Sequence, residues 1–255
     1  MTQTRQPHDS QAPPRTSTLQ RAILMRLAEV EYERFATTLV GLRPQDWSNP
    51  TDCPGWDVRA MAGHVLGMAE MAASLRETRR QQQAAQRRGG VFIDALTAHQ
   101  VETRAHLSRH DVIERFQRIG PRAARARRRT PGLLRRRRMP VAQWVGGQLE
   151  EWTLGFLLDT ILTRDPWMHR IDIARATGRA PHLTPDHDAI LVADVVAEWA
   201  ARHGRPVELQ LTGPAGGSWS FGIGTTKLTL DAIDFCRTLS RREPGTDLLA
   251  TEVPF

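Results

Sequence analysis

Apolar residues recur every three to four positions along most of the chain up to residue 202, which is the spacing of amphipathic helices. The first helical segment covers residues 16–42, with Ser17 or Thr18 as its cap. The second begins at Asp57, a natural N-cap residue. Further helical patterns cover residues 91–108, 112–129, 149–162 and 186–202. The pattern predicts a mainly α-helical protein.

Proline, glycine and polar residues mark the breaks between these helices. Residues 43–56 are rich in proline, asparagine, aspartate, glycine and tryptophan, so we predict a loop. Gly120-Pro121 predicts an interruption of the helix around it, because a proline ring clashes with the carbonyl four residues earlier. We also predict a solvated helix end at residues 81–88 and a short connection at residues 141–147.

The period of the pattern changes to two beyond Gly204. Residues 207–212 and 219–223 alternate between apolar and polar on either side of a glycine-rich turn, which predicts a β-hairpin. A further helix is expected within residues 228–239. This part is too short to fold alone and must pack on the helices. We therefore expect three parts, with the second boundary between 180 and 205: a disordered tail (1–15), a helical bundle (16–180) and a small α+β domain (181–255).

Composition changes this picture only through its charge. The chain has 255 residues, enough for a sizeable core, and a formal net charge of +7. Lys227 is the only lysine, so the arginine bias is as typical of a GC-rich genome as of an anionic ligand. The arginine-rich segment 122–138 is either a phosphate-binding strip or a solvated turn. No aromatic residues interleave with its arginines to stack on bases, so we favour the solvated turn and do not expect a nucleic acid partner.

The two cysteines and the hydropathy indicate the cellular environment of the protein. Cys53 and Cys236 form no CxxC pair, which argues against a disulfide framework or a cysteine-based zinc site. No run of eighteen apolar residues and no apolar signal segment is present. We therefore expect a soluble cytoplasmic protein without a membrane partner.

The segment 164–178 carries the first candidate chemistry. Asp165 and His169 are four residues apart, so on a helix their side chains lie one turn apart on the same face and can hold one ion. Asp172 lies three residues further on, where it can orient the imidazole or add a ligand. Pro166 leaves two alternatives: the helix kinks there, or a new helix starts with Asp165 as N-cap and Pro166 at N1. In the second case Asp165 is a cap.

His64 supplies a possible third ligand from the helix that begins at Asp57. A single histidine on an apolar face is more often a core residue than a ligand, but Asp165 and His169 offer it partners. Helical bundles build metal sites in their cores from side chains of facing helices. Two imidazoles and one carboxylate suit Zn²⁺, and three protein ligands leave one position for water or substrate.

Two motifs resemble those of a known family. Residues 51–59 (TDCPGWDVR), followed by Gly63-His64-Val65, closely resemble the CPGW loop and helix of the mycothiol-dependent maleylpyruvate isomerase family, a branch of the DinB-like metal proteins. Residues 164–178 (RDPWMHRIDIARATG) resemble its second signature, and residues 230–240 resemble its C-terminal domain. The resemblance spans most of the chain.

The resemblance implies a DinB-like four-helix bundle that binds a divalent metal, commonly Zn²⁺, through His64, Asp165 and His169. The isomerase itself has a glutamate where this chain has Asp165. The family also has a Gly-Arg pair near the C-terminus whose arginine is implicated in binding an anionic substrate. The matching residues here are Ser240-Arg241-Arg242, without the glycine, so Arg242 is the catalytic candidate.

The resemblance further implies that mycothiol is the cosubstrate and that a metal-bound thiolate adds to a small electrophile. Release after bond rotation gives an isomerase, whereas retention of the adduct gives a thiol S-transferase. A non-catalytic DinB-like metal-binding or regulatory module is the alternative. Cys53 lies in the CPGW loop, where a structural turn that packs Trp56 is expected rather than a nucleophile.

Overall fold

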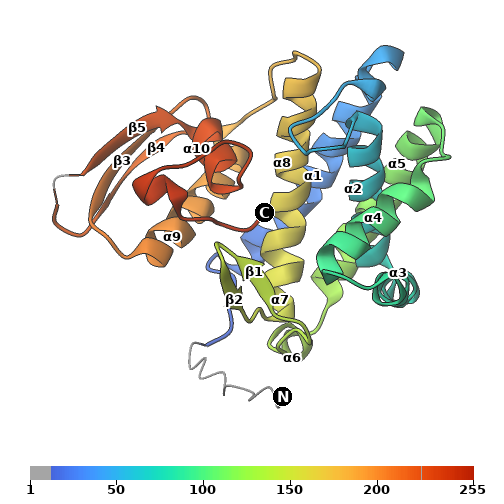
Figure 1. The fold of residues 1–255 in the computed structure, drawn as a ribbon, viewed down its shortest axis with the longest axis horizontal. Helices are drawn as coiled ribbons and strands as arrows, with labels where there is room; N and C mark the ends of the chain where they lie inside the picture. The colour runs from blue at the N-terminus through green and yellow to red at the C-terminus, as the bar shows by residue number, and fades with distance from the viewer. Residues whose placement is uncertain (1–12, 225) are drawn as a thin grey trace, which may run out of the picture.

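The structure, a computed structural model, describes residues 13–224 and 226–255. It is mainly α-helical with a small C-terminal α+β part, as predicted (Figure 1). Residues 1–12 of the expected tail lie outside the described residues. The longer helices are α1 (Arg21–Val40), α2 (Val58–Ala73), α3 (Leu75–Arg88), α4 (Phe92–Arg104), α5 (Arg109–Arg129), α8 (Leu162–Ala176), α9 (Ile190–His203) and α10 (Ala232–Leu239). Short helical turns are η1 (Pro44–Ser48), α6 (Gly132–Arg135), η3 (Pro185–Ala189) and η4 (Asp247–Ala250).

Helices α1, α2, α5 and α8 form a four-helix bundle, and α3 and α4 pack outside α2. The apolar stripes that the sequence predicts face the bundle core, where Phe35 of α1, Met61 of α2 and Phe116 of α5 are fully buried. Asp57 caps α2 as predicted, because its side chain accepts a hydrogen bond of 2.8 Å from the backbone N–H of Ala60. The bundle therefore holds α2 and α8 at fixed positions beside each other.

The predicted interruption at Gly120-Pro121 is wrong, because α5 continues unbroken from Arg109 to Arg129. Gly120 lies against Tyr32 of α1, and a Cβ at this glycine would come within 3.2 Å of the Tyr32 Cβ. The glycine thus allows α1 and α5 to pack closely. This packing holds the helix through the proline, although the proline removes one backbone hydrogen bond.

The predicted helix at 149–162 is also wrong in its first part. Residues 143–150 form a hairpin of β1 (Gln143–Val145) and β2 (Gln148–Glu150), with Trp144 directly opposite Leu149. Gly146 and Gly147, at φ of 58° and 74°, supply the left-handed turn between the strands. The helical segment begins only at α7 (Leu154–Phe156) and passes through a π-helical turn, η2 (Leu157–Ile161), into α8. Apolar residues continue from the strand into the helix, so the sequence pattern does not show where one ends and the other begins.

Two arginines of the arginine-rich segment 122–138 are buried and bind the junction between the π-helical turn η2 and α8. Arg127 donates to the carbonyl of Leu162 at 3.0 Å and to the Thr163 hydroxyl. Arg135 forms a buried ion pair with Asp159 of the π-helical turn. These two side chains therefore stabilise the fold, and the expectation that the segment does not bind nucleic acid stays a prediction.

The C-terminal part is a three-stranded sheet covered by α9 and α10. Strand β3 (Val207–Thr212) pairs antiparallel with β4 (Gly217–Phe221), which confirms the predicted hairpin, and parallel with β5 (Lys227–Asp231). Strand β5 was not predicted. The inner face of β3 packs with Trp199 of α9 and with Trp167 and Met168 of α8 in one core. Because that core is shared, the division of the chain between 180 and 205 remains a proposal.

A buried ionic network fixes α8 between α1 and η3. Glu31 of α1, which is fully buried, accepts from Arg170 of α8 at 2.8 Å and lies 2.8 Å from His187 Nε2. Asp188 accepts from Arg170 at 2.9 Å and from Arg34 of α1 at 2.6 Å. Each carboxylate thus has hydrogen-bonding partners on two elements and an ion pair with Arg170, which offsets the cost of burial.

Candidate metal centre

The structure brings the three predicted ligands together. Nε2 of His64 on α2 lies 3.3 Å from Asp165 Oδ1, and Nε2 of His169 lies 3.4 Å from the same oxygen. One candidate ligand atom from each residue lies within 4.8 Å of the other two. The helical spacing of Asp165 and His169 on α8 produces their half of the group, and the antiparallel packing of α2 supplies His64.

Asp165 is not a helix cap, so that alternative is wrong. It lies inside α8, which begins at Leu162. The ψ angle of Leu162 is 4°, far from the helical value of about −42°, so its carbonyl is turned away from the ring of Pro166. The π-helical turn before α8 therefore removes the clash that a proline at this position would otherwise cause, and the carboxylate of Asp165 is left free for the centre.

The donor set fits a divalent metal. Asp165 Oδ2 is buried and has no hydrogen-bond partner among the described residues. A buried polar atom without a partner is costly unless a ligand completes it. Two imidazole nitrogens and a carboxylate oxygen are ligands that Zn²⁺ accepts in sites with one open position. We therefore regard these three residues as able to hold such an ion.

Charge within the group agrees with this chemistry. Burial alone would raise the pKa of Asp165, but the two imidazoles beside it lower that pKa well below its usual range. Burial would likewise lower the pKa of His169, yet the Asp165 carboxylate raises it well above the usual value. The site thus concentrates negative charge that a proton or a metal cation can balance.

A chain of buried amides fixes the ring of His64. Its Nδ1 lies 2.8 Å from Gln100 Oε1 of α4, whose amide nitrogen donates to Gln81 Oε1 at 2.9 Å. Gln81 in turn donates to Glu77 Oε1 at 2.8 Å. Because the Gln100 nitrogen is committed to Gln81, its oxygen accepts the Nδ1 proton of His64 and leaves Nε2 to face Asp165.

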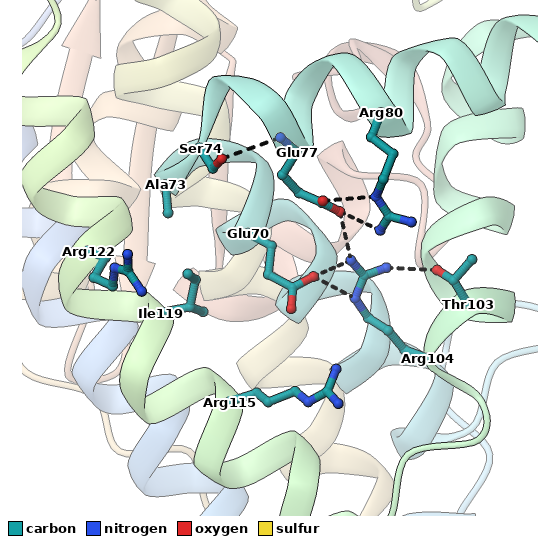
Figure 2. A pocket seen from close by; sticks show the side chains of 10 residues that line it. All are labelled: Glu70, Ala73, Ser74, Glu77, Arg80, Thr103, Arg104, Arg115, Ile119 and Arg122. Carbon is teal, nitrogen blue, oxygen red and sulfur yellow. Dashed lines mark hydrogen bonds and ion pairs between the residues drawn. The ribbon is translucent and has the colours of Figure 1, made fainter.

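Figure 2 shows the outer end of this chain, in a pocket between α2, α3, α4 and α5. Glu77 pairs with Arg80, and Arg104 pairs with Glu70, so both carboxylates are fixed by arginine forks. Gln81 falls in the segment predicted to be a solvated helix end, and for this residue the prediction is wrong because it is fully buried. In the sequence, the burial of Gln81 is indicated only by its spacing of four residues from Ala85, which is also buried.

Replacement of Gln100 by leucine is expected to lower the affinity for Zn²⁺ by about 10- to 100-fold, the usual cost of losing an outer partner of a ligating histidine. Leucine fills similar space but cannot accept the His64 proton. Competition with a chromogenic chelator measures the affinity. Gln86→Leu, on the exposed face of α3, is the matched control. Unchanged affinity in the Gln100→Leu protein would contradict this role of Gln100 in orienting His64.

On the other side, Asp172 orients His169. Asp172 Oδ2 lies 3.1 Å from His169 Nδ1, and the carboxylate accepts from Arg242 Nε and Nη2, each at 2.7 Å. Burial would raise the pKa of Asp172, but the hydrogen bonds from His169 and Arg242 lower it, so the group stays a carboxylate. In both histidines, a side-chain oxygen thus accepts the Nδ1 proton, so that Nε2 faces Asp165.

Arg242, the predicted catalytic residue, lies at the edge of the centre. Its Nη2 is 3.4 Å from His169 Nδ1, and its side chain lines the cavity described below. The expected glycine is absent, yet the preceding residue, Arg241, adopts the left-handed conformation with φ of 64°. An arginine therefore occupies the conformation that glycine adopts at least cost.

Arg241→Gly is expected to raise the free energy of unfolding by about 1 kcal/mol, since it removes the left-handed strain of a side chain with a Cβ. The ion pair of Arg241 with Glu252 is exposed and contributes little. Urea unfolding measures the change. Ser240→Gly is the control, because Ser240 has φ of −92° and gains nothing from glycine. A destabilised Arg241→Gly protein would show that the side chain matters more than the strain.

The centre opens into a cavity of about 660 Å³. Trp56 of the CPGW loop covers the imidazoles, with ring centroids 5.1 Å from His64 and 6.0 Å from His169. Cys53 of the same loop is half-buried, and its Sγ lies 4.0 Å from Asp172 Oδ2. The loop thus packs its tryptophan over the candidate ligands and shields them from water.

Comparisons with known proteins identify similar sequences and folds. The family model for the mycothiol maleylpyruvate isomerase N-terminal domain matches residues 28–174. The fold is similar to the crystal structure of the mycothiol-dependent maleylpyruvate isomerase, with a TM-score of 0.58, 17% identity, and coverage of 94% of this chain and 98% of that chain. The fold is also similar to the crystal structure of a histidine-to-alanine mutant of that enzyme, with a TM-score of 0.58, 14% identity, and coverage of 90% of this chain and 93% of that chain. No curated protein matches the sequence.

The hydropathy of the helices adds one finding. Among the residues that the structure describes, none of the helices combines the length and the apolar character needed to cross a bilayer.

Proposed function

Because this chain belongs to the mycothiol maleylpyruvate isomerase family, whose N-terminal domain model matches more than half of its length, we propose that it is a metal-dependent thiol enzyme of the isomerase or S-transferase type. The family expected from the two motifs is thereby confirmed. The observation that carries the proposal is the convergence of His64, Asp165 and His169 beside a cavity, with Asp165 Oδ2 unpartnered among the described residues.

We assign the metal to these three side chains, with Zn²⁺ as the ion that their donor atoms favour. When bound, such a cation lowers the pKa of a thiol at its open position, so that a nucleophile exists at neutral pH. Gln100 and Asp172 hold the Nδ1 protons, which keeps both Nε2 atoms available.

The remaining residues of the site act on the two substrates. The cavity volume of about 660 Å³ is within the usual range for pockets that hold drug-sized molecules, which leaves room for mycothiol and a small electrophile. Arg242 faces the cavity from beside His169, where its guanidinium can bind an anionic or carbonyl oxygen of the electrophile. Asp172 holds that guanidinium in place through its two hydrogen bonds.

In the proposed reaction, the thiol sulfur forms a bond to one carbon of a conjugated double bond, and the π electrons move onto the carbonyl oxygen near Arg242. Rotation about the former double bond and release of the thiol give an isomer. Protonation of the carbon instead gives a thioether, which is the transferase outcome. The ligand set is common to both outcomes, because the fate of the adduct depends on the shape of the pocket.

Metal analysis together with thiol-dependent turnover tests the proposal. We expect about one divalent metal per chain and activity with mycothiol on a panel of electrophiles that includes maleylpyruvate. If the metal-loaded protein fails to bind mycothiol at millimolar concentration, the chain is a non-catalytic metal-binding module instead.

A further inference from the structure

The cavity beside the metal centre extends in a definite direction along the bundle. Helices α2 and α8 are antiparallel (Figure 1). Asn49 accepts from the backbone N–H of Val58 at the start of α2 and donates to the carbonyl of Ala176 at the end of α8. Met68 and Met71 follow His64 on α2 and line the cavity. With a rise of about 1.5 Å per residue, Met71 lies about 10 Å beyond His64 along the helix axis.

The antiparallel partner continues the same wall. Ile161 and Leu157 of the π-helical turn precede Asp165, so they lie in the same direction from the centre as the two methionines. Phe92 and Leu96 of α4 and Trp144 of β1 also line the cavity. We call this apolar part of the cavity, formed by Met68, Met71, Phe92, Leu96, Trp144 and Leu157, the apolar gallery.

The positively charged side chains of the cavity wall are already paired with carboxylates. Among the described residues, Arg241 and Arg242 are the arginines that line the cavity, and no lysine does. Arg242 binds Asp172, which lies beyond His169 on α8 and therefore away from the gallery. Arg241 is exposed and pairs with Glu252. Among the described residues of the cavity wall, a carboxylate placed in the gallery would therefore meet no unpaired cation to offset its desolvation.

We infer that the electrophile is a conjugated carbonyl compound with one oxygen group for Arg242 and an aryl or alkyl body for the apolar gallery, rather than a dicarboxylate. This inference rests on the proposed function for the reacting double bond. The apolar body of the electrophile is inferred from the side chains of the gallery alone, since burial of apolar surface against Met, Phe, Leu and Trp is favourable.

Trp144 is the gallery residue best suited to a test. This residue is 70% exposed, so truncation costs little stability, yet it lines the cavity from the β1–β2 hairpin. Leu149 lies directly opposite on β2 and is absent from the cavity wall. The hairpin is fixed to the C-terminal segment by a bond of 2.8 Å from Gly146 N–H to Glu252. Leu149→Ala therefore controls for changes in the hairpin itself.

The experiment measures binding of two unreactive probes to the full chain by calorimetry: 4-phenylbutan-2-one, a ketone with an aryl body, and succinate, a dicarboxylate. We expect the ketone to bind at least about tenfold more tightly, as burial of a phenyl group predicts. Trp144→Ala should weaken ketone binding about three- to tenfold, and Leu149→Ala should not.

Tighter or equal binding of succinate, or no binding of the ketone, would overturn the inference. An unchanged affinity of the Trp144→Ala protein for the ketone would also overturn it. Neither probe has a C=C bond conjugated to its carbonyl group, so their binding does not depend on thiol chemistry. A protein that binds the ketone but fails the mycothiol titration would disprove the proposed function and leave the apolar gallery established as a binding site.

Discussion

Replacement of His169 by alanine is expected to lower the affinity for Zn²⁺ by about a hundredfold or more. Structural zinc sites with four ligands bind with about 10–16 kcal/mol, so one ligand contributes about 3 kcal/mol. Each 1.4 kcal/mol is a factor of ten in affinity. Loss of the imidazole also leaves Asp165 and Asp172 without the partner that they share. Thiol-dependent turnover should fall with the metal content.

The measurement is metal content after dialysis against a weak chelator, followed by competition titration. His64→Ala should behave alike, because the two Nε2 atoms occupy equivalent positions about Asp165. His110→Ala is the matched control, since His110 lies on the surface of α5 with its side chain 77% exposed. The assignment of the ligands fails if the His64→Ala and His169→Ala proteins both retain their full metal content.

Replacement of Glu31 by alanine is expected to reduce the free energy of unfolding by about 3–5 kcal/mol, the usual result of removing one partner from a buried ion pair. Glu31 is fully buried between Arg170 and His187. Without it, Asp188, which Arg34 also uses, is the carboxylate left to Arg170 among the described residues, beside the carbonyl of His182. Because Arg170 follows His169 directly, the centre should lose metal affinity as well.

Urea unfolding of the metal-free protein measures this effect without a contribution from the ion. Glu29→Ala on the same helix is the control, because the pair of Glu29 with Arg128 is about half-exposed on both sides. Exposed pairs contribute less than about 1 kcal/mol. Equal effects of the two substitutions would show that the buried network contributes no more than a surface pair.

The sequence pattern predicted the bundle because helical periodicity is a local signal, and it grouped Asp165 with His169 for the same reason. It failed where tertiary contacts decide. Strand β5 pairs in parallel with β3, a partner about twenty residues away, and its apolar residues look like the start of the helix that follows. The arginine-rich segment likewise gave no sign that Arg127 and Arg135 are buried.

The sequence grouped the three candidate ligands with Asp172, the support of His169, but it missed the amides that support His64. His64 and its partners follow from residue chemistry, from helical spacing and from the resemblance of two motifs. Gln81 and Gln100 do not, because an amide that orients a histidine has no characteristic neighbours in the sequence. Their role depends on the packing of α3 and α4 against α2, which only the structure provides.

The π-helical turn at Leu157–Ile161 has a consequence for the evolution of the site. A π-helical turn accommodates one residue more than an α-helical turn, and one residue corresponds to a rotation of about 100°. Loss of a single residue from this turn would therefore rotate α8 relative to α7, or shift its register in the bundle. In either case Asp165 and His169 would both move away from His64, and the candidate metal centre would be lost. A one-residue deletion here should thus be rarer among functional descendants of this chain than deletions in the adjoining hairpin.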